Sequence, residues 1–205
     1  MKKVAVFASG RGSNFKQLCI AQKNKKFNAE IALLIASKPE IGAIEIAREY
    51  DIPYQVFKSK DFADIEEFTN ALISCLKNHS IDFIVLAGWM KLIHSSIVKA
   101  FENRILNIHP ALLPFFGGKG MYGHHVHRAV WESGMLVSGA TVHIVDEEYD
   151  RGMIIKQEAV QLDFDDSPES ISQKVLKIEH KIYPEALKML VEGKINFNDK
   201  HGKSK

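Results

Sequence analysis

Two residues near the middle of the chain have side chains suited to acid–base chemistry. The segment Asn107-Ile108-His109-Pro110 places an amide and an imidazole two positions apart. An amide N–H can donate to a developing oxyanion, and an imidazole can carry a proton near neutral pH. A single histidine near the end of a strand is more often a hydrogen-bonded structural residue, so the pair alone does not establish catalysis.

An acid-rich turn later in the sequence offers a partner for this imidazole. Residues 146–152 contain four carboxylates and one glycine. A carboxylate from this turn could orient His109 and stabilise its protonated form. Four acids in one turn are equally consistent with a solvated tip.

A third segment suggests an anion site. Residues 10–14, Gly-Arg-Gly-Ser-Asn, lie between an apolar run and a helical pattern. Glycines allow close backbone approach, and the N–H groups at a helix N-terminus attract phosphate. A dinucleotide fingerprint would need a small residue in place of Phe15 and an acid in place of Ser37 or Lys38, so a phosphate monoester fits better than NAD. A plain strand-to-helix turn is the alternative.

Metal and disulfide chemistry are not expected. His124, His125 and His127 are close in sequence, but no carboxylate or cysteine with ligand spacing adjoins them. Cys19 and Cys75 each lie within a helical pattern and form no C-x-x-C motif. We interpret both cysteines as small buried hydrophobic residues and predict no bound metal.

The elements that must position these residues alternate between apolar runs and amphipathic stretches. Continuous apolar strands separated by amphipathic helices indicate a parallel sheet covered on both faces. In such sheets ligands bind beyond the carboxyl ends of the strands, where His109 and the glycine-rich turn are expected. We predict strands over residues 4–8, 31–36, 54–57, 83–87 and 105–108, and helices from residue 15 and over residues 43–50, 64–78 and 95–101.

The last third of the chain adds a different pattern. A glycine-rich loop over residues 110–123 precedes a helix over 126–132, two strands over 139–145 and 154–162, and a helix that begins after Ser167 with Pro168 and runs to 191. The two strands predict an antiparallel hairpin at the edge of the sheet. The fold class is therefore α/β, doubly wound and Rossmann-type, with one domain over 1–193 and a polar tail over 194–205.

Composition excludes several classes of protein. The 205 residues are 46% hydrophobic and 25% charged, as in ordinary globular chains. The net charge of +2 gives no general excess of positive charge of the kind that binds nucleic acid. No apolar run approaches the ~20 residues that span a bilayer. Arg11 interrupts the N-terminal apolar stretch before a signal peptide core forms. We expect a cytoplasmic protein with no nucleic-acid or membrane partner.

Five motifs, in order along nearly the whole chain, carry a family resemblance. They are residues 10–14, 86–90, 107–114, 150–152 and 179–184, which read GRGSN, LAGWM, NIHPALLP, DRG and EHKIYP. Together they resemble the phosphoribosylglycinamide formyltransferase family of purine biosynthesis. The resemblance implies a formyltransferase-like fold and transfer of formyl from 10-formyltetrahydrofolate to the amine of phosphoribosylglycinamide, without a metal or covalent intermediate.

The resemblance also assigns roles to individual residues. It implies that Asn107, His109 and Asp150 are catalytic. It implies that Gly12, Ser13 and Asn14 bind the substrate phosphate and that Glu179 contacts the ribose. Backbone contacts to the pterin would come from Met90, Lys91, Leu92 and Ile93. Ile65 stands where many members have an arginine near the folate, with Lys58 or Lys60 as possible substitutes. Ala111 replaces a commoner serine, and the loop over 115–125 is longer than in many relatives.

Two other functions remain open at this stage. A hydrolase could release formate from the same folate with water in place of the amine, although water needs no phosphate anchor. A phosphate- or nucleotide-binding module would leave Asn107, His109 and Asp150 with structural roles only. The sequence leaves the oligomeric state open between monomer and homodimer.

Overall fold

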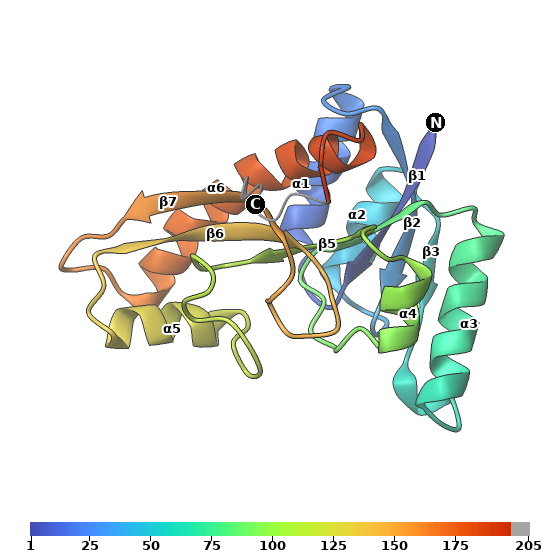
Figure 1. Ribbon diagram of the computed structural model, residues 1–205, viewed down its shortest axis with the longest axis horizontal. Helices are drawn as coiled ribbons and strands as arrows, with labels where there is room; N and C mark the ends of the chain where they lie inside the picture. Colours follow the sequence, from blue (N-terminus) through green and yellow to red (C-terminus); the bar gives the residue numbers. More distant parts are fainter. Residues whose placement is uncertain (198–205) are drawn as a thin grey trace, which may run out of the picture.

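A seven-stranded sheet forms the centre of the structure, with the strand order β3-β2-β1-β4-β5-β6-β7 (Figure 1). The computed structural model describes residues 1–197. Strands β1 to β5 are parallel, whereas β6 runs antiparallel to β5 and β7 antiparallel to β6. The strands are β1 (Lys2–Ala8), β2 (Ala29–Ala36), β3 (Tyr54–Val56), β4 (Phe83–Leu86), β5 (Ile105–His109), β6 (Val137–Ile144) and β7 (Ile154–Gln161).

Helices cover both faces of this sheet. Residues of α1, α2, α5 and α6 pack in one core cluster, and residues of α3 and α4 pack in a second cluster on the opposite face (Figure 1). The α-helices are α1 (Ser13–Lys23), α2 (Gly42–Glu49), α3 (Ile65–Asn78), α4 (Ser95–Ala100), α5 (His124–Glu132) and α6 (Pro168–Val191). The predicted doubly wound fold with its late antiparallel hairpin is therefore confirmed.

Burial on both faces explains why the strands are continuously apolar. In β1, Val4 and Val6 belong to one core cluster, whereas Ala5 and Phe7 belong to the other. All four side chains are fully buried. Because side chains alternate across a strand, a central parallel strand has no solvent-facing side on which polar residues would be stable.

Most predicted elements occur within two residues of their expected bounds. Ser167 caps α6 by accepting a hydrogen bond from Ser170 N–H, and Pro168 is the first helical residue. A short 3₁₀ helix, Ser59–Asp61, had no signal in the periodicity. Within residues 1–197 no helix is long and apolar enough to cross a membrane. The predicted tail falls largely on residues 198–205, which lie outside the described residues.

A buried tyrosine joins α6 to the centre of the sheet. The hydroxyl of Tyr183 donates to the carbonyl of Leu86 at 2.9 Å and lies 3.2 Å from the carbonyl of Leu106. These carbonyls belong to the neighbouring strands β4 and β5. Tyr183 is fully buried, so no water can replace its hydroxyl. The contact therefore holds the last residue of β4 and the residue of β5 that directly precedes Asn107.

The Tyr183→Phe substitution should reduce stability through this contact. Loss of the hydroxyl leaves buried carbonyl capacity unsatisfied, and we expect the free energy of unfolding to fall by about 1–3 kcal/mol. Urea denaturation followed by circular dichroism measures the change. Tyr50→Phe is the matched control, because Tyr50 is half-buried against the same core cluster. Equal unfolding midpoints for the two variants would contradict the proposed contact.

Candidate active site

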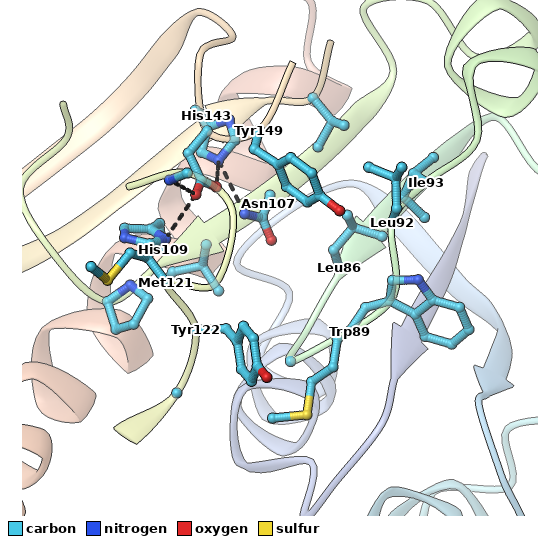
Figure 2. Close-up of a pocket in the computed structure, with 18 of the residues that line it drawn as sticks. Leu86, Trp89, Leu92, Ile93, Asn107, His109, Met121, Tyr122, His143 and Tyr149 are labelled. Atoms are coloured by element: carbon cyan, nitrogen blue, oxygen red, sulfur yellow. Dashed lines mark hydrogen bonds and ion pairs between the residues drawn. The ribbon is translucent and has the colours of Figure 1, made fainter. Parts of the chain in front are cut away.

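A cavity of about 260 Å³ lies at the carboxyl ends of β1, β4 and β5. Its walls come from the end of β4 and the loop after it, the end of β5, the loop before α5, and the turn between β6 and β7. One residue each from α1, α5, β6 and α6 completes the lining. Figure 2 shows Asn107, His109 and His143 gathered at one end and Trp89, Leu92 and Ile93 at the other. This position is where doubly wound sheets bind their ligands.

A chain of polar contacts connects four side chains at the first end of the cavity. Asn107 Nδ2 lies 3.0 Å from His143 Nε2. His143 Nε2 lies 3.5 Å from one carboxylate oxygen of Asp150, and His109 Nδ1 lies 3.6 Å from the other. Both imidazoles are almost completely buried. The carboxylate of Asp150 is thus placed between two rings that it can stabilise as cations.

The hydrogen bonds of His143 determine how the Asn107 amide is oriented. His143 Nδ1 lies 2.9 Å from the carbonyl oxygen of Ile144, and only a protonated nitrogen can donate to that oxygen. In the neutral ring Nε2 is then an acceptor, and it takes one N–H of Asn107. The second N–H of Asn107 remains for the cavity. A protonated His143 would instead donate from Nε2 toward Asp150.

Both ring nitrogens of His109 have partners. Nε2 donates to the carbonyl of Phe116 at 2.8 Å, and Nδ1 faces Asp150. Burial lowers the pKa of His109, while the charge of Asp150 and the Phe116 carbonyl act in the opposite direction. The ring is therefore neutral more readily than in water, yet it sits beside a carboxylate that stabilises it when it is protonated.

Asp150 remains ionised despite its partial burial. Burial alone raises its pKa, but the neighbouring His143, the charge of His109 and a hydrogen bond from Gly118 N–H together bring it below the ordinary value. The Gly118 N–H lies 2.9 Å from Oδ2. Asp150 is thus suited to holding a cationic imidazole or accepting a proton through water.

A second buried carboxyl group lies across the cavity. Asn14 Nδ2 donates to Glu179 Oε2 at 2.5 Å, joining α1 to α6. Burial raises the pKa of Glu179 to about 7, and the hydrogen bond from Asn14 opposes this rise. Asn14 Oδ1 is buried and has no hydrogen-bond partner among residues 1–197. This unpaired acceptor lines a wall that a polar ligand could satisfy.

The glycine-rich turn is built for close packing as well as for anion binding. Gly12 has a φ of 81°, and a Cβ there would lie 2.8 Å from the Cα of Ala43 in α2. Gly12 is buried and Ser13 is exposed, and neither is among the residues lining the cavity, whereas Asn14 is. The N–H groups of the first turn of α1 lack acceptors one turn earlier, as at any helix N-terminus. The predicted phosphate contacts of Gly12 and Ser13 thus remain predictions.

The segment after β4 forms the opposite end of the cavity. Met90, Lys91, Leu92 and Ile93 all line it. The N–H of Met90 donates to the hydroxyl of Ser9 at 3.2 Å, which ties the segment to the end of β1. Met90 and Leu92 are each 60% exposed, so an apolar surface is available to a planar ligand.

Most residues predicted for the site meet in this cavity. Asn107, His109, Asp150, Asn14 and Glu179 all line it together with the segment after β4.

The lining residues that sequence reasoning missed include His143, Tyr122 and Tyr149. The antiparallel pairing of β5 and β6 places His143 directly opposite Asn107. A prediction of the register between β5 and β6 could have found His143. The two tyrosines lie in loops, where no strand register predicts their position.

The three histidines of α5 differ in their surroundings. The rings of His124 and His125 lie 4.0 Å apart between centroids. His127 is buried and lines the cavity, and desolvation followed by the nearby His109 lowers its pKa to about 4. Over residues 1–197, no three or more His, Cys, Asp or Glu side chains are arranged to hold a metal ion.

The pattern of the formyl transferase family matches residues 2–187. The chain belongs to the formyl transferase family. The match spans every strand of the sheet and α6 as far as its last turn.

Individual relatives agree with this assignment. The chloroplastic phosphoribosylglycinamide formyltransferase of Arabidopsis thaliana is 45% identical over 97% of this chain and 68% of its own length. The phosphoribosylglycinamide formyltransferase of Bacillus subtilis (strain 168) is 41% identical over 93% of this chain and 95% of its own. The structure of glycinamide ribonucleotide transformylase 1 from Symbiobacterium toebii matches with a TM-score of 0.92 and 32% identity, over 98% of this chain and 92% of that one. The family resemblance and the fold inferred from sequence are confirmed.

Glu179→Gln should change how stability depends on pH. In the folded chain the pKa of Glu179 is about 7, whereas its ordinary value is 4.5. Between pH 4.5 and 7, therefore, Glu179 carries a proton in the folded state but has lost it in the unfolded state. The resulting stabilisation is present at low pH, is on the order of 3 kcal/mol, and is lost as pH rises through 7. We expect the unfolding free energy to fall less between pH 5 and 8.5 in the variant.

Urea titrations at several pH values measure this difference. Glu102→Gln is the matched control, because Glu102 is an exposed glutamate just after α4. Parallel pH profiles for the wild type and Glu179→Gln would show that Glu179 titrates in the folded chain as it does in water.

Proposed function

We propose that this chain transfers the formyl group of 10-formyltetrahydrofolate to the amine of phosphoribosylglycinamide. The observation that carries the proposal is one cavity that Asn107, His109 and Asp150 line together with the polar pair of Asn14 and Glu179 and the largely apolar segment after β4. Two substrates, one anionic and polar and the other planar, suit such a site. The family assignment and the names of the relatives support the same reaction.

The reaction begins with attack of the amine nitrogen on the formyl carbon. A C–N bond forms and the carbonyl electrons move to oxygen, giving a tetrahedral oxyanion. The free N–H of Asn107 and an N–H of protonated His109 are the proposed donors to this oxygen. Because Phe116 now accepts from His109 Nε2, the oxyanion would replace that carbonyl as the acceptor while Asp150 keeps its contact.

Collapse of the intermediate needs a proton to move between two nitrogens. The attacking amine becomes cationic, and the folate nitrogen must be protonated as its bond to carbon breaks. Asp150 can accept the first proton, directly or through water, and return it to the leaving nitrogen. His109 stabilises the oxyanion throughout, so neither group is changed after a turnover.

The other walls account for substrate binding in this proposal. The start of α1, with Gly12, Ser13 and Asn14, binds the substrate phosphate through N–H groups and the helix dipole. Glu179, held by Asn14, accepts from the ribose hydroxyls. The backbone of Met90, Lys91, Leu92 and Ile93 contacts the pterin, which the exposed apolar surface there would cover.

A direct assay tests the reaction, with His109→Ala and Asp150→Asn as variants. The purified protein is given 10-formyltetrahydrofolate with and without phosphoribosylglycinamide, and the formylated product is measured. We expect amine-dependent turnover in the wild type and kcat lower by about 10²- to 10⁴-fold in both variants, with KM changed far less. Formate release without the amine at a comparable rate would indicate a hydrolase, and binding without turnover would indicate a binding module.

His143→Leu tests whether the buried ring orients Asn107. Without the acceptor Nε2 the amide can rotate and present its oxygen to the oxyanion, so we expect kcat to fall by about 10- to 100-fold with little change in KM. His143→Gln retains an acceptor and should recover part of the loss. Ser138→Ala, at a buried position on the same strand, controls for disturbance of β6. Equal kcat in His143→Leu and Ser138→Ala would contradict the role.

A further inference from the structure

A polar network that the proposed reaction does not use joins the last three strands of the sheet, β5, β6 and β7. The strand register places Thr141 of β6 directly opposite His109 of β5 on one side and Gln157 of β7 on the other. Residues opposite one another on neighbouring antiparallel strands have their side chains on the same face of the sheet. The three side chains therefore form a row, and of the three only His109 lines the cavity.

The hydroxyl of Thr141 uses its full hydrogen-bonding capacity on the segment that follows His109 and on Gln157. It donates to the carbonyl of Ala111 at 2.7 Å and accepts from the N–H of Leu113 at 3.0 Å. It also accepts an N–H of Gln157 at 2.8 Å. A hydroxyl has one donor and two acceptor positions, so all three are occupied. Thr141 is fully buried, and water therefore cannot replace this hydroxyl.

Gln157 completes the network from the edge strand. Its amide nitrogen also donates to the carbonyl of Leu113 at 3.0 Å. Because that carbonyl can only accept, the nitrogen of the amide, and not its oxygen, faces it. Both backbone groups of Leu113 are thus held, the N–H by Thr141 and the carbonyl by Gln157. Leu113 is buried, where an unpaired backbone group would be costly.

Leu113 transmits this restraint to Asp150. A Cβ on Gly117 would lie 2.6 Å from Leu113 Cδ2 and 3.3 Å from Asp150 Cβ, so the backbone of Gly117 lies tightly between these two side chains. The next residue, Gly118, donates its N–H to Asp150 Oδ2 at 2.9 Å. A shift of Leu113 would therefore move the backbone that contacts the carboxylate.

The same segment carries the hydrogen-bond acceptor of His109. The carbonyl of Phe116 accepts from His109 Nε2 at 2.8 Å. Phe116 has a φ of 54°, in the left-handed region that a residue with a bulky side chain rarely adopts. Such a conformation persists only where the surrounding contacts impose it. The bonds from Thr141 and Gln157 to Leu113 restrain the chain just before Phe116 and are contacts of this kind.

We propose that Thr141 and Gln157 are positioning residues for formyl transfer. They hold residues 111–113 and through this segment set the orientation of His109 and Asp150, although neither lines the cavity. The inference rests on the proposed function, because it concerns the same catalytic pair. It gives the edge strand β7 a part in catalysis, even though no residue of β7 lines the cavity.

Kinetics of Thr141→Val and Thr141→Ser test the role of the hydroxyl. Valine keeps the shape of threonine but forms no hydrogen bond, so residues 111–113 lose two bonds and can shift. Since small misplacements of catalytic groups are costly, we expect kcat to fall about 10- to 100-fold, with the KM of either substrate changed far less. Serine keeps the hydroxyl and should recover most of the loss. Thr69→Val is the matched control, because Thr69 is also buried and its hydroxyl has no hydrogen-bond partner among residues 1–197.

Variants of Gln157 test the network from the surface. Gln157 is exposed, so its replacement leaves the core intact and decides the question if Thr141→Val does not fold. Gln157→Met removes both N–H donors at similar length, and Gln157→Glu also places a negative charge beside the carbonyl of Leu113. We expect both to lower kcat, Gln157→Glu more strongly. Gln161→Met, at an exposed position on the same strand, should keep the wild-type kcat.

Proton NMR distinguishes positioning from a general loss of stability. The Nε2 proton of His109 is bonded to the carbonyl of Phe116, so it should give a downfield signal that exchanges slowly with water and is absent in His109→Ala. We expect faster exchange of this proton in Thr141→Val and Gln157→Met but not in Thr69→Val. Wild-type kcat in the first two variants would overturn the proposal, as would an equal loss in Thr69→Val. Absence of turnover in the wild type would reject the proposed function, and unchanged proton exchange would separately overturn the positioning of His109.

Discussion

The antiparallel pairing of β6 with β5 is the constraint on which the rest of the site depends. It sets His143 opposite Asn107 and directs the following turn back over the strand ends, where Asp150 meets both imidazoles. Gly152 makes this return possible, because a Cβ there would lie only 1.8 Å from the carbonyl oxygen of Ile144. The parallel part of the sheet supplies Asn107 and His109. The antiparallel strand β6 and the turn after it supply His143, which contacts Asn107, and Asp150, which faces His109.

The electrostatics of the cavity are balanced between burial and pairing. Desolvation pushes His109 toward its neutral form, and Asp150 acts against that push. Across the cavity the hydrogen-bond partner of Glu179 is the neutral amide of Asn14, and burial moves the pKa of Glu179 close to neutrality. Two carboxyl groups in one cavity therefore have different protonation behaviour because one faces imidazoles and the other does not. Such a difference allows one acid to hold charge while the other carries a proton at the same pH.

The fold was predictable from the sequence because each buried strand is a continuous apolar run and each helix repeats apolar residues every three to four positions. The start of α6 was predicted to the residue, since Ser167 and Pro168 form a strong local signal. The site was predictable only where motifs carry it. His143 depends on strand register, and the burial of Glu179 depends on how α6 packs against α1, which no local pattern encodes. The network of Thr141 and Gln157 likewise joins segments far apart in the sequence.

The contact of Tyr183 with the strand ends also bears on which changes of length the chain tolerates. Glu179 precedes Tyr183 by one helical turn, so both lie on the same face of α6, one toward the substrate wall and the other toward β4 and β5. Inserting or deleting one residue between them would rotate one by about 100° relative to the other and break a contact. Homologous chains of different length should therefore keep this turn of α6 intact.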